Sequence, residues 1–208
     1  MDDACCSGPV EQAADPRARP ALWVALGLNA LMCVVELGAS WTSGSVSLMA
    51  DAVDFAGDAA NYGLSLFVLA RARATRAKAA VFKVACMAAF GIAVLGRALH
   101  AALDGALPEA FTMGAVGFAA LAVNAAVALL LFRFRAGEAN LRSAWICSRN
   151  DALGNLAVMA AALGVFGTAS AWPDLLVAGV MAALALGGAA SVLRQARREL
   201  RGAACADR

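Results

Sequence analysis

Three aspartates in an otherwise apolar stretch are the residues of this chain best placed to do chemistry. Asp51, Asp54 and Asp58 follow one another at spacings of three and four within residues 47–69. On a helix with about 100° per residue they fall within roughly 60° of one another and form one acidic stripe. A carboxylate inside a bilayer costs about 2.5 kcal/mol or more. The stripe therefore predicts an ion, a proton or a partner group beside it.

A second chemical segment lies further along the chain. Cys147 and Asp151 are four residues apart and share one face of a predicted helix, with Asn155 a turn further on. Asp54 and Asp58 repeat this spacing. Two helices that each offer such a pair can close a roughly tetrahedral site with three oxygens and one sulfur. That donor set suits Zn²⁺ or Cd²⁺ better than Mg²⁺ or Ca²⁺, which prefer six or more oxygen ligands.

The composition indicates that lipid surrounds the elements carrying these residues. Hydrophobic residues make up 62% of the chain and charged residues 15%, against about 25% charged in soluble domains. We therefore predict an all-α integral membrane protein with six transmembrane helices. The apolar stretches span roughly 21–41, 47–69, 79–99, 111–132, 143–166 and 172–193. They predict an N-terminal tail over 1–20, a six-helix transmembrane domain over 21–194 and a C-terminal tail over 195–208.

Basic residues gather at alternate ends of the predicted helices. The links over 42–46, 100–110 and 167–171 contain no Lys or Arg. The basic residues of the remaining segments include Arg17, Arg19, Arg71, Arg73, Arg76, Lys78, Arg133, Arg135, Arg142, Arg194, Arg197, Arg198 and Arg201. The positive-inside rule then places both termini in the cytoplasm. The polar first 20 residues contain no cleavable leader, and we expect a cell (inner) membrane location. Because the basic residues follow the membrane topology, we expect no nucleic-acid partner.

The two ligand pairs, in the second and fifth of six helices, resemble those of the cation diffusion facilitators, six-helix metal/proton antiporters. The run Ser-Gly-Ser-Val-Ser-Leu-Met-Ala-Asp-Ala-Val-Asp-Phe-Ala-Gly-Asp is similar to the family's segment ending in a (His/Asp)-x-x-x-Asp pair, here Asp54 and Asp58. The run Asn-Asp-Ala-Leu-Gly-Asn looks like the stretch after the family's second pair, usually His-x-x-x-Asp, here Cys147 and Asp151. The resemblance covers most of residues 20–195. It implies export of a divalent heavy-metal cation in exchange for protons, with the metal as cargo, no cofactor and a possible homodimer.

Two departures from the family pattern change what the resemblance implies. Cys147 stands where the family usually has His, and a thiolate shifts the expected preference toward Cd²⁺, Zn²⁺ or Hg²⁺. We also expect a short form, because the cytoplasmic domain that many relatives carry after the sixth helix has no counterpart after Leu193. Any dimer would then be held by the membrane helices.

Five further residues are candidates for accessory roles. Asp51 could support a ligand or serve as an outer stopping point for the ion. Glu36 could be an accessory proton or metal site, or could bond to another helix. Asn155 adds an amide beside the second pair. The vicinal Cys5 and Cys6 could capture metal at the cytoplasmic entrance, or could belong to an unstructured tail.

Another class of function stays open beside transport. The chain could be a metal-binding membrane sensor, or an accessory subunit of an efflux system, that does not itself transport. An intramembrane enzyme is not expected, because the chain has no His-Glu-x-x-His, Gly-x-Ser-x-Gly or phosphate-binding Gly-rich motif. Small residues are expected to permit close helix contacts: Gly57, Ala59, Ala60, Gly63, Gly154, Gly187 and Gly188.

Overall fold

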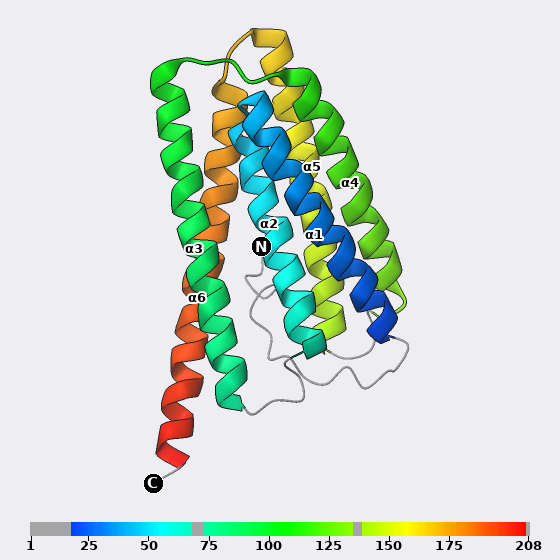
Figure 1. The fold of residues 1–208 in the computed structure, drawn as a ribbon, viewed down its shortest axis with the longest axis vertical. Coiled ribbons are helices and arrows are strands. Elements are labelled where there is room, and N and C mark those ends of the chain that lie inside the picture. Colours follow the sequence, from blue (N-terminus) through cyan, green and yellow to red (C-terminus); the bar gives the residue numbers. More distant parts are fainter. Residues whose placement is uncertain (1–17, 68–72, 135–138, 207–208) are drawn as a thin grey trace.

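Six helices account for all the secondary structure in the part of the chain that the computed structural model describes, residues 18–67, 73–134 and 139–206. The helices are α1 (Ala18–Ser43), α2 (Val46–Phe67), α3 (Arg73–Asp104), α4 (Ala110–Phe132), α5 (Ala139–Thr168) and α6 (Trp172–Ala206). Successive helices run in opposite directions, so α1 begins and α6 ends at the same end of the bundle (Figure 1). The prediction of an all-α fold is confirmed.

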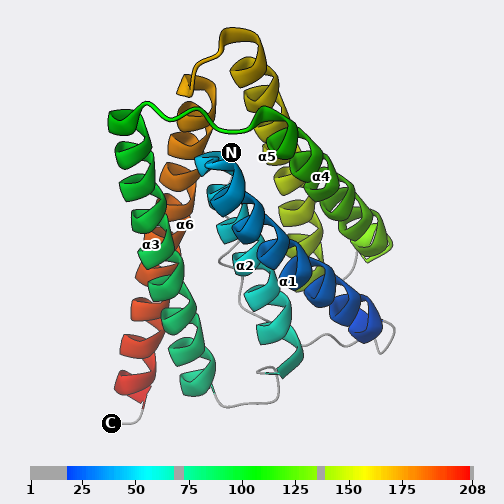
Figure 2. The same ribbon diagram turned by 45° about the horizontal axis from the view of Figure 1, so that its top comes forward.

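Two helices extend well beyond their predicted apolar stretches. α3 has 32 residues and α6 has 35, against the predicted ranges 79–99 and 172–193. Hydropathy marks only the part of a helix that lies in lipid. The helix itself extends as far as its backbone hydrogen bonds are formed, which includes residues outside the lipid. The two helices run side by side, and they diverge from the other four toward the end where α6 finishes (Figures 1 and 2).

By length and composition, four helices among the described residues are candidate membrane spans. They are Arg19–Ser43, Ala110–Phe132, Ala144–Thr168 and Trp172–Ala190. α2 is long enough to cross a membrane, but it carries three carboxylates in its 22 residues. The count of six spans therefore stays a prediction, as does the side of the membrane on which the termini lie.

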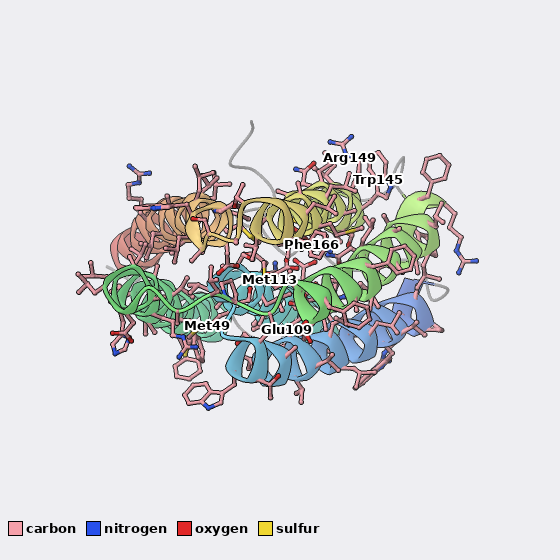
Figure 3. All side chains as sticks on the ribbon, turned by 90° about the horizontal axis from the view of Figure 1, so that it is seen from above. Met49, Glu109, Met113, Trp145, Arg149 and Phe166 are labelled. Carbon is pink, nitrogen blue, oxygen red and sulfur yellow. The ribbon has the colours of Figure 1, made fainter. Side chains whose placement is uncertain are left out.

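The acidic helix α2 is the central element of the bundle. It contacts all five other helices and lies in the middle of the view along the bundle (Figure 3). Asp51 and Asp58 are buried together with apolar neighbours such as Leu48 and Phe55. The large exposed side chains instead belong to the surrounding helices, as with Leu163 on α5. This arrangement keeps the carboxylates away from lipid, where their charge would be most costly.

A carboxylate from α6 caps the first turn of α2. Asp174, buried at the start of α6, accepts hydrogen bonds from Ser45 Oγ (2.7 Å), the Val46 amide (2.8 Å) and the Ser47 amide (3.0 Å). Gly44, with φ at +73°, makes the tight turn that brings α2 back beside α1. The first amides of a helix lack partners within the helix, and a negative charge is favourable there. Asp174 therefore fixes this end of α2 against α6.

The start of α4 is capped at the same end of the bundle. Glu109 accepts hydrogen bonds from the amides of Phe111 (3.1 Å) and Thr112 (2.9 Å), and its own amide donates to the Ser43 carbonyl (2.8 Å). Hydrogen bonds from the Thr112 side chain and amide, and from the Phe111 amide, lower the pKa of Glu109. The cap is therefore ionised at neutral pH and joins α4 to the end of α1.

The close helix contacts predicted from small residues occur at other positions. A Cβ added at Gly63, Gly154, Gly187 or Gly188 would meet no atom within 4 Å, so the prediction was wrong for these glycines. A Cβ at Gly164 of α5 would instead lie 2.9 Å from the Pro173 side chain of α6, and one at Gly91 of α3 would lie 3.1 Å from Leu186. Sequence spacing does not reveal which face of a helix meets a neighbour.

Replacing Asp174 by Ala should lower the free energy of unfolding by about 2 kcal/mol, because α2 loses a buried cap with three hydrogen bonds. Thermal unfolding in detergent micelles would measure this loss. Asp104→Ala is the control, since its pair with His100 is exposed and worth about 0–1 kcal/mol. Equal destabilisation by the two substitutions would contradict the proposed role of the cap.

Candidate metal site between α2 and α5

The four predicted metal ligands lie on two helices that contact each other. Asp54 and Asp58 belong to α2, and Cys147 and Asp151 belong to α5. Asp58 and Cys147 are buried, while Asp54 and Asp151 are half-buried. Over the described residues, no group of three or more His, Cys, Asp or Glu side chains is close enough to hold a metal ion. The four-ligand site therefore stays a prediction.

A tyrosine connects the two helices at this position. The hydroxyl of Tyr62, on α2, lies 3.2 Å from Asp58 Oδ2 and 2.9 Å from Ser148 Oγ, on α5. It also interacts electrostatically with Cys147 and Asp151. The buried phenol therefore joins Asp58 of α2 to the residue next to Cys147 on α5.

The sequence analysis did not identify either of these two hydroxyl groups. Tyr62 lies one turn after Asp58 and is the only tyrosine of the chain, and Ser148 directly follows Cys147. Their spacing to the predicted ligands was a usable signal. However, only the packing of α2 against α5 shows that the two hydroxyls meet.

Asp51, the first aspartate of the acidic stripe, faces α1 and not α5. Glu36 of α1 is fully buried and lies near Asp51, with Asp54 and Cys33 also nearby. Among the described groups, neither Glu36 oxygen nor Asp51 Oδ2 has a hydrogen-bond donor. An ionised carboxylate can only accept hydrogen bonds, so a direct bond between Glu36 and Asp51 requires a proton on one of them. Glu36 thus lies near a carboxyl of α2, and both roles expected of it stay predictions.

Three buried asparagines add unpaired polar atoms to the interior. Asn29 Oδ1, Asn124 Oδ1 and both amide atoms of Asn155 have no hydrogen-bond partner among the described residues. A buried polar group without a partner costs about 1–3 kcal/mol. Such atoms on α1, α4 and α5 make the interior polar, and water or a passing ion could satisfy them.

Three further polar residues are Cys5, Cys6 and Arg149. Cys5 and Cys6 are outside the described residues, so their proposed role in metal capture stays a prediction. Arg149 is exposed on the outer face of α5, where its guanidinium lies 5.3 Å from the centre of the Trp145 ring and donates to Asn150 Oδ1 at 3.2 Å (Figure 3). Two residues along a helix correspond to a rotation of about 200°, so Arg149 points away from Cys147.

Comparison with known proteins identifies the family. Residues 22–201 match the family model described as the cation efflux transmembrane domain. The chain belongs to the cation efflux family, the cation diffusion facilitators. It is therefore a membrane protein whose domain transports a metal cation, and the resemblance seen in the sequence is confirmed. A search of curated proteins found no match to the chain.

Glu36→Gln should stabilise this cation efflux protein. The amide supplies the donor that two facing carboxyl groups lack, and we expect a gain of about 1 kcal/mol and a melting temperature a few degrees higher. Thermal unfolding at pH 7.5 would measure it, with the exposed Asp104→Asn as the control. A lower melting temperature for Glu36→Gln would show that the carboxyl has a favourable partner in the native protein.

Proposed function

We propose that the chain exports a divalent heavy-metal cation, Zn²⁺ or Cd²⁺, from the cytoplasm in exchange for protons. Membership of the cation efflux family supports cation transport. The observation that supports the site is the Tyr62 hydroxyl, which joins Asp58 of α2 to Ser148, the neighbour of Cys147, on α5. Asp54, Asp58, Cys147 and Asp151 would supply three oxygens and one sulfur to the metal, a donor set suited to Zn²⁺ or Cd²⁺.

Competition between protons and metal for the same ligands would couple the two fluxes. When the site faces the cytoplasm, the metal binds as the carboxyl and thiol groups lose protons. When it faces outward, protons displace the metal, so the inward proton gradient drives efflux. The site must therefore alternate between the two sides of the membrane, as in other secondary transporters.

The remaining expectations complete this proposal. Both termini would lie in the cytoplasm of a cell with the protein in its inner membrane, and six helices would span the bilayer. A dimer, if formed, would be held by the membrane helices. The protein would have no enzymatic activity, and the metal would be its cargo.

Asp58→Ala should abolish proton-driven metal uptake into proteoliposomes that contain only this chain. Loss of a residue that merely supports a ligand typically costs about 10- to 100-fold in metal affinity or activity, and loss of a buried ligand should cost at least as much. Uptake of Zn²⁺, Cd²⁺ and Co²⁺ under an imposed pH gradient would be compared for the native protein, Asp58→Ala and the exposed control Asp104→Ala. Undiminished uptake by Asp58→Ala would exclude the proposed site.

The same experiment separates transport from the alternative function. If the native protein binds metal but moves none of the three ions, with or without a gradient, it is a sensor or an accessory subunit. If it moves metal without any dependence on the pH gradient, the proposed exchange for protons is wrong while transport stands.

Cys147→His should retain Zn²⁺ transport and lower the preference for Cd²⁺ and Hg²⁺, because imidazole is a less soft ligand than a thiolate. The ratio of Cd²⁺ to Zn²⁺ transport rates would measure the change. Cys86→Ser, a half-buried thiol on α3, is the matched control and should leave the ratio unchanged. An unaltered ratio in Cys147→His would remove Cys147 from the ligand set.

A further inference from the structure

The Tyr62 hydroxyl occupies a position from which it can respond to metal at Asp58. Its ring is buried in an apolar cluster with Leu22 of α1 and Val127 and Leu131 of α4, so the phenol is held firmly in place. Only the hydroxyl reaches the polar interior, where it lies between Asp58 of α2 and a serine of α5.

The chemistry of the three groups sets the direction of the hydrogen bonds. A phenol has one proton, and an ionised carboxylate can only accept, so Tyr62 donates to Asp58 Oδ2. Its proton is then used, and Ser148 must be the donor in the 2.9 Å contact with the Tyr62 oxygen. Ser148 therefore donates to Tyr62, and Tyr62 donates to Asp58. In a buried site such a chain stabilises the carboxylate more than it would in water.

A divalent cation that binds Asp58 through Oδ2 would compete with the Tyr62 hydrogen for that oxygen. The hydroxyl hydrogen carries partial positive charge and points at the oxygen that the cation would approach, and a low dielectric strengthens the resulting repulsion. A neutral phenol is a poor metal ligand, so the Tyr62 hydroxyl would not gain a favourable bond to the cation by keeping its orientation toward Asp58. Rotation of its O–H bond would relieve the repulsion, and Ser148 Oγ is the nearby acceptor.

We propose that Tyr62 is a positioning residue, which holds Asp58 by a hydrogen bond when no metal is bound. The transported cation breaks this hydrogen bond, and the Tyr62 hydroxyl then donates to Ser148 instead. This rests on the proposed function and adds a switch at the same site. Because Asp58 and Ser148 belong to different helices, the exchange of hydrogen bonds transmits metal binding directly to the contact between α2 and α5.

The phenol can be observed directly, since Tyr62 is the only tyrosine of the chain. Protein labelled with ¹³C at the tyrosine carbon that bears the hydroxyl should give one NMR resonance from this residue. In the native full-length protein, Cd²⁺ should shift this resonance, and Asp58→Asn should shift it without metal and remove the response to Cd²⁺. Cd²⁺ binding with an unchanged resonance would overturn the inference.

Tyr62→Phe provides the second test, because it keeps the buried ring and removes only the hydroxyl. A metal that must break a hydrogen bond to Asp58 should bind more tightly once that bond is absent, by about tenfold. Maximal transport should fall because the metal is released more slowly. A purely structural role for Tyr62 would weaken binding instead. Calorimetric titration with Cd²⁺ decides between these results, and unchanged or weaker binding would overturn the inference.

Ser148→Ala should act in the opposite direction. Without Ser148 the displaced hydroxyl has lost its acceptor, so Cd²⁺ should bind more weakly than to the native protein. Ser40→Ala is the matched control, a buried serine that bonds to the Leu37 carbonyl of its own helix. Equal effects of the two substitutions would overturn the role of Ser148. Absence of both Cd²⁺ binding and flux in the native protein would instead refute the proposed function.

Discussion

The cost of placing carboxylates inside a membrane governs this structure. α2 carries three of them in 22 residues, and a helix of this kind cannot face lipid without loss of stability. The bundle meets this constraint by putting α2 at its centre, in contact with all five other helices. Apolar residues such as Leu163 and Phe118 then form the outer faces.

The centre of the bundle is polar along much of α2, but its partners change from one turn to the next. Asp51 faces Glu36 of α1, whereas Asp58 is linked through Tyr62 to Ser148 of α5. The first contact joins two acidic groups that need a proton between them, and the second joins a carboxylate to hydroxyl donors. In the proposed exchange, a proton could therefore bind at Asp51 and the metal at Asp58, about two turns further along the same helix.

Two carboxylate caps lie at one end of the bundle. Asp174 caps α2 from α6 through three hydrogen bonds, and Glu109 joins the start of α4 to the end of α1. Toward the other end α3 and α6 diverge from the remaining helices (Figure 2). A transporter must keep its helices together while its binding site changes from one side of the membrane to the other. The Asp174 and Glu109 caps hold helices together at one end of the bundle.

The sequence by itself determined the all-helical fold, the approximate helix positions and the family, because hydropathy and the period of a helix are local properties. It also placed Asp54 with Asp58 and Cys147 with Asp151 on shared helix faces, and this spacing carried the family resemblance. Which helices meet was decided only by the tertiary structure. The Tyr62–Ser148 contact, the Asp174 cap and the close approach at Gly164 all join residues from different helices. Such contacts depend on the rotation and depth of each helix in the bundle, which spacing along a single helix cannot reveal.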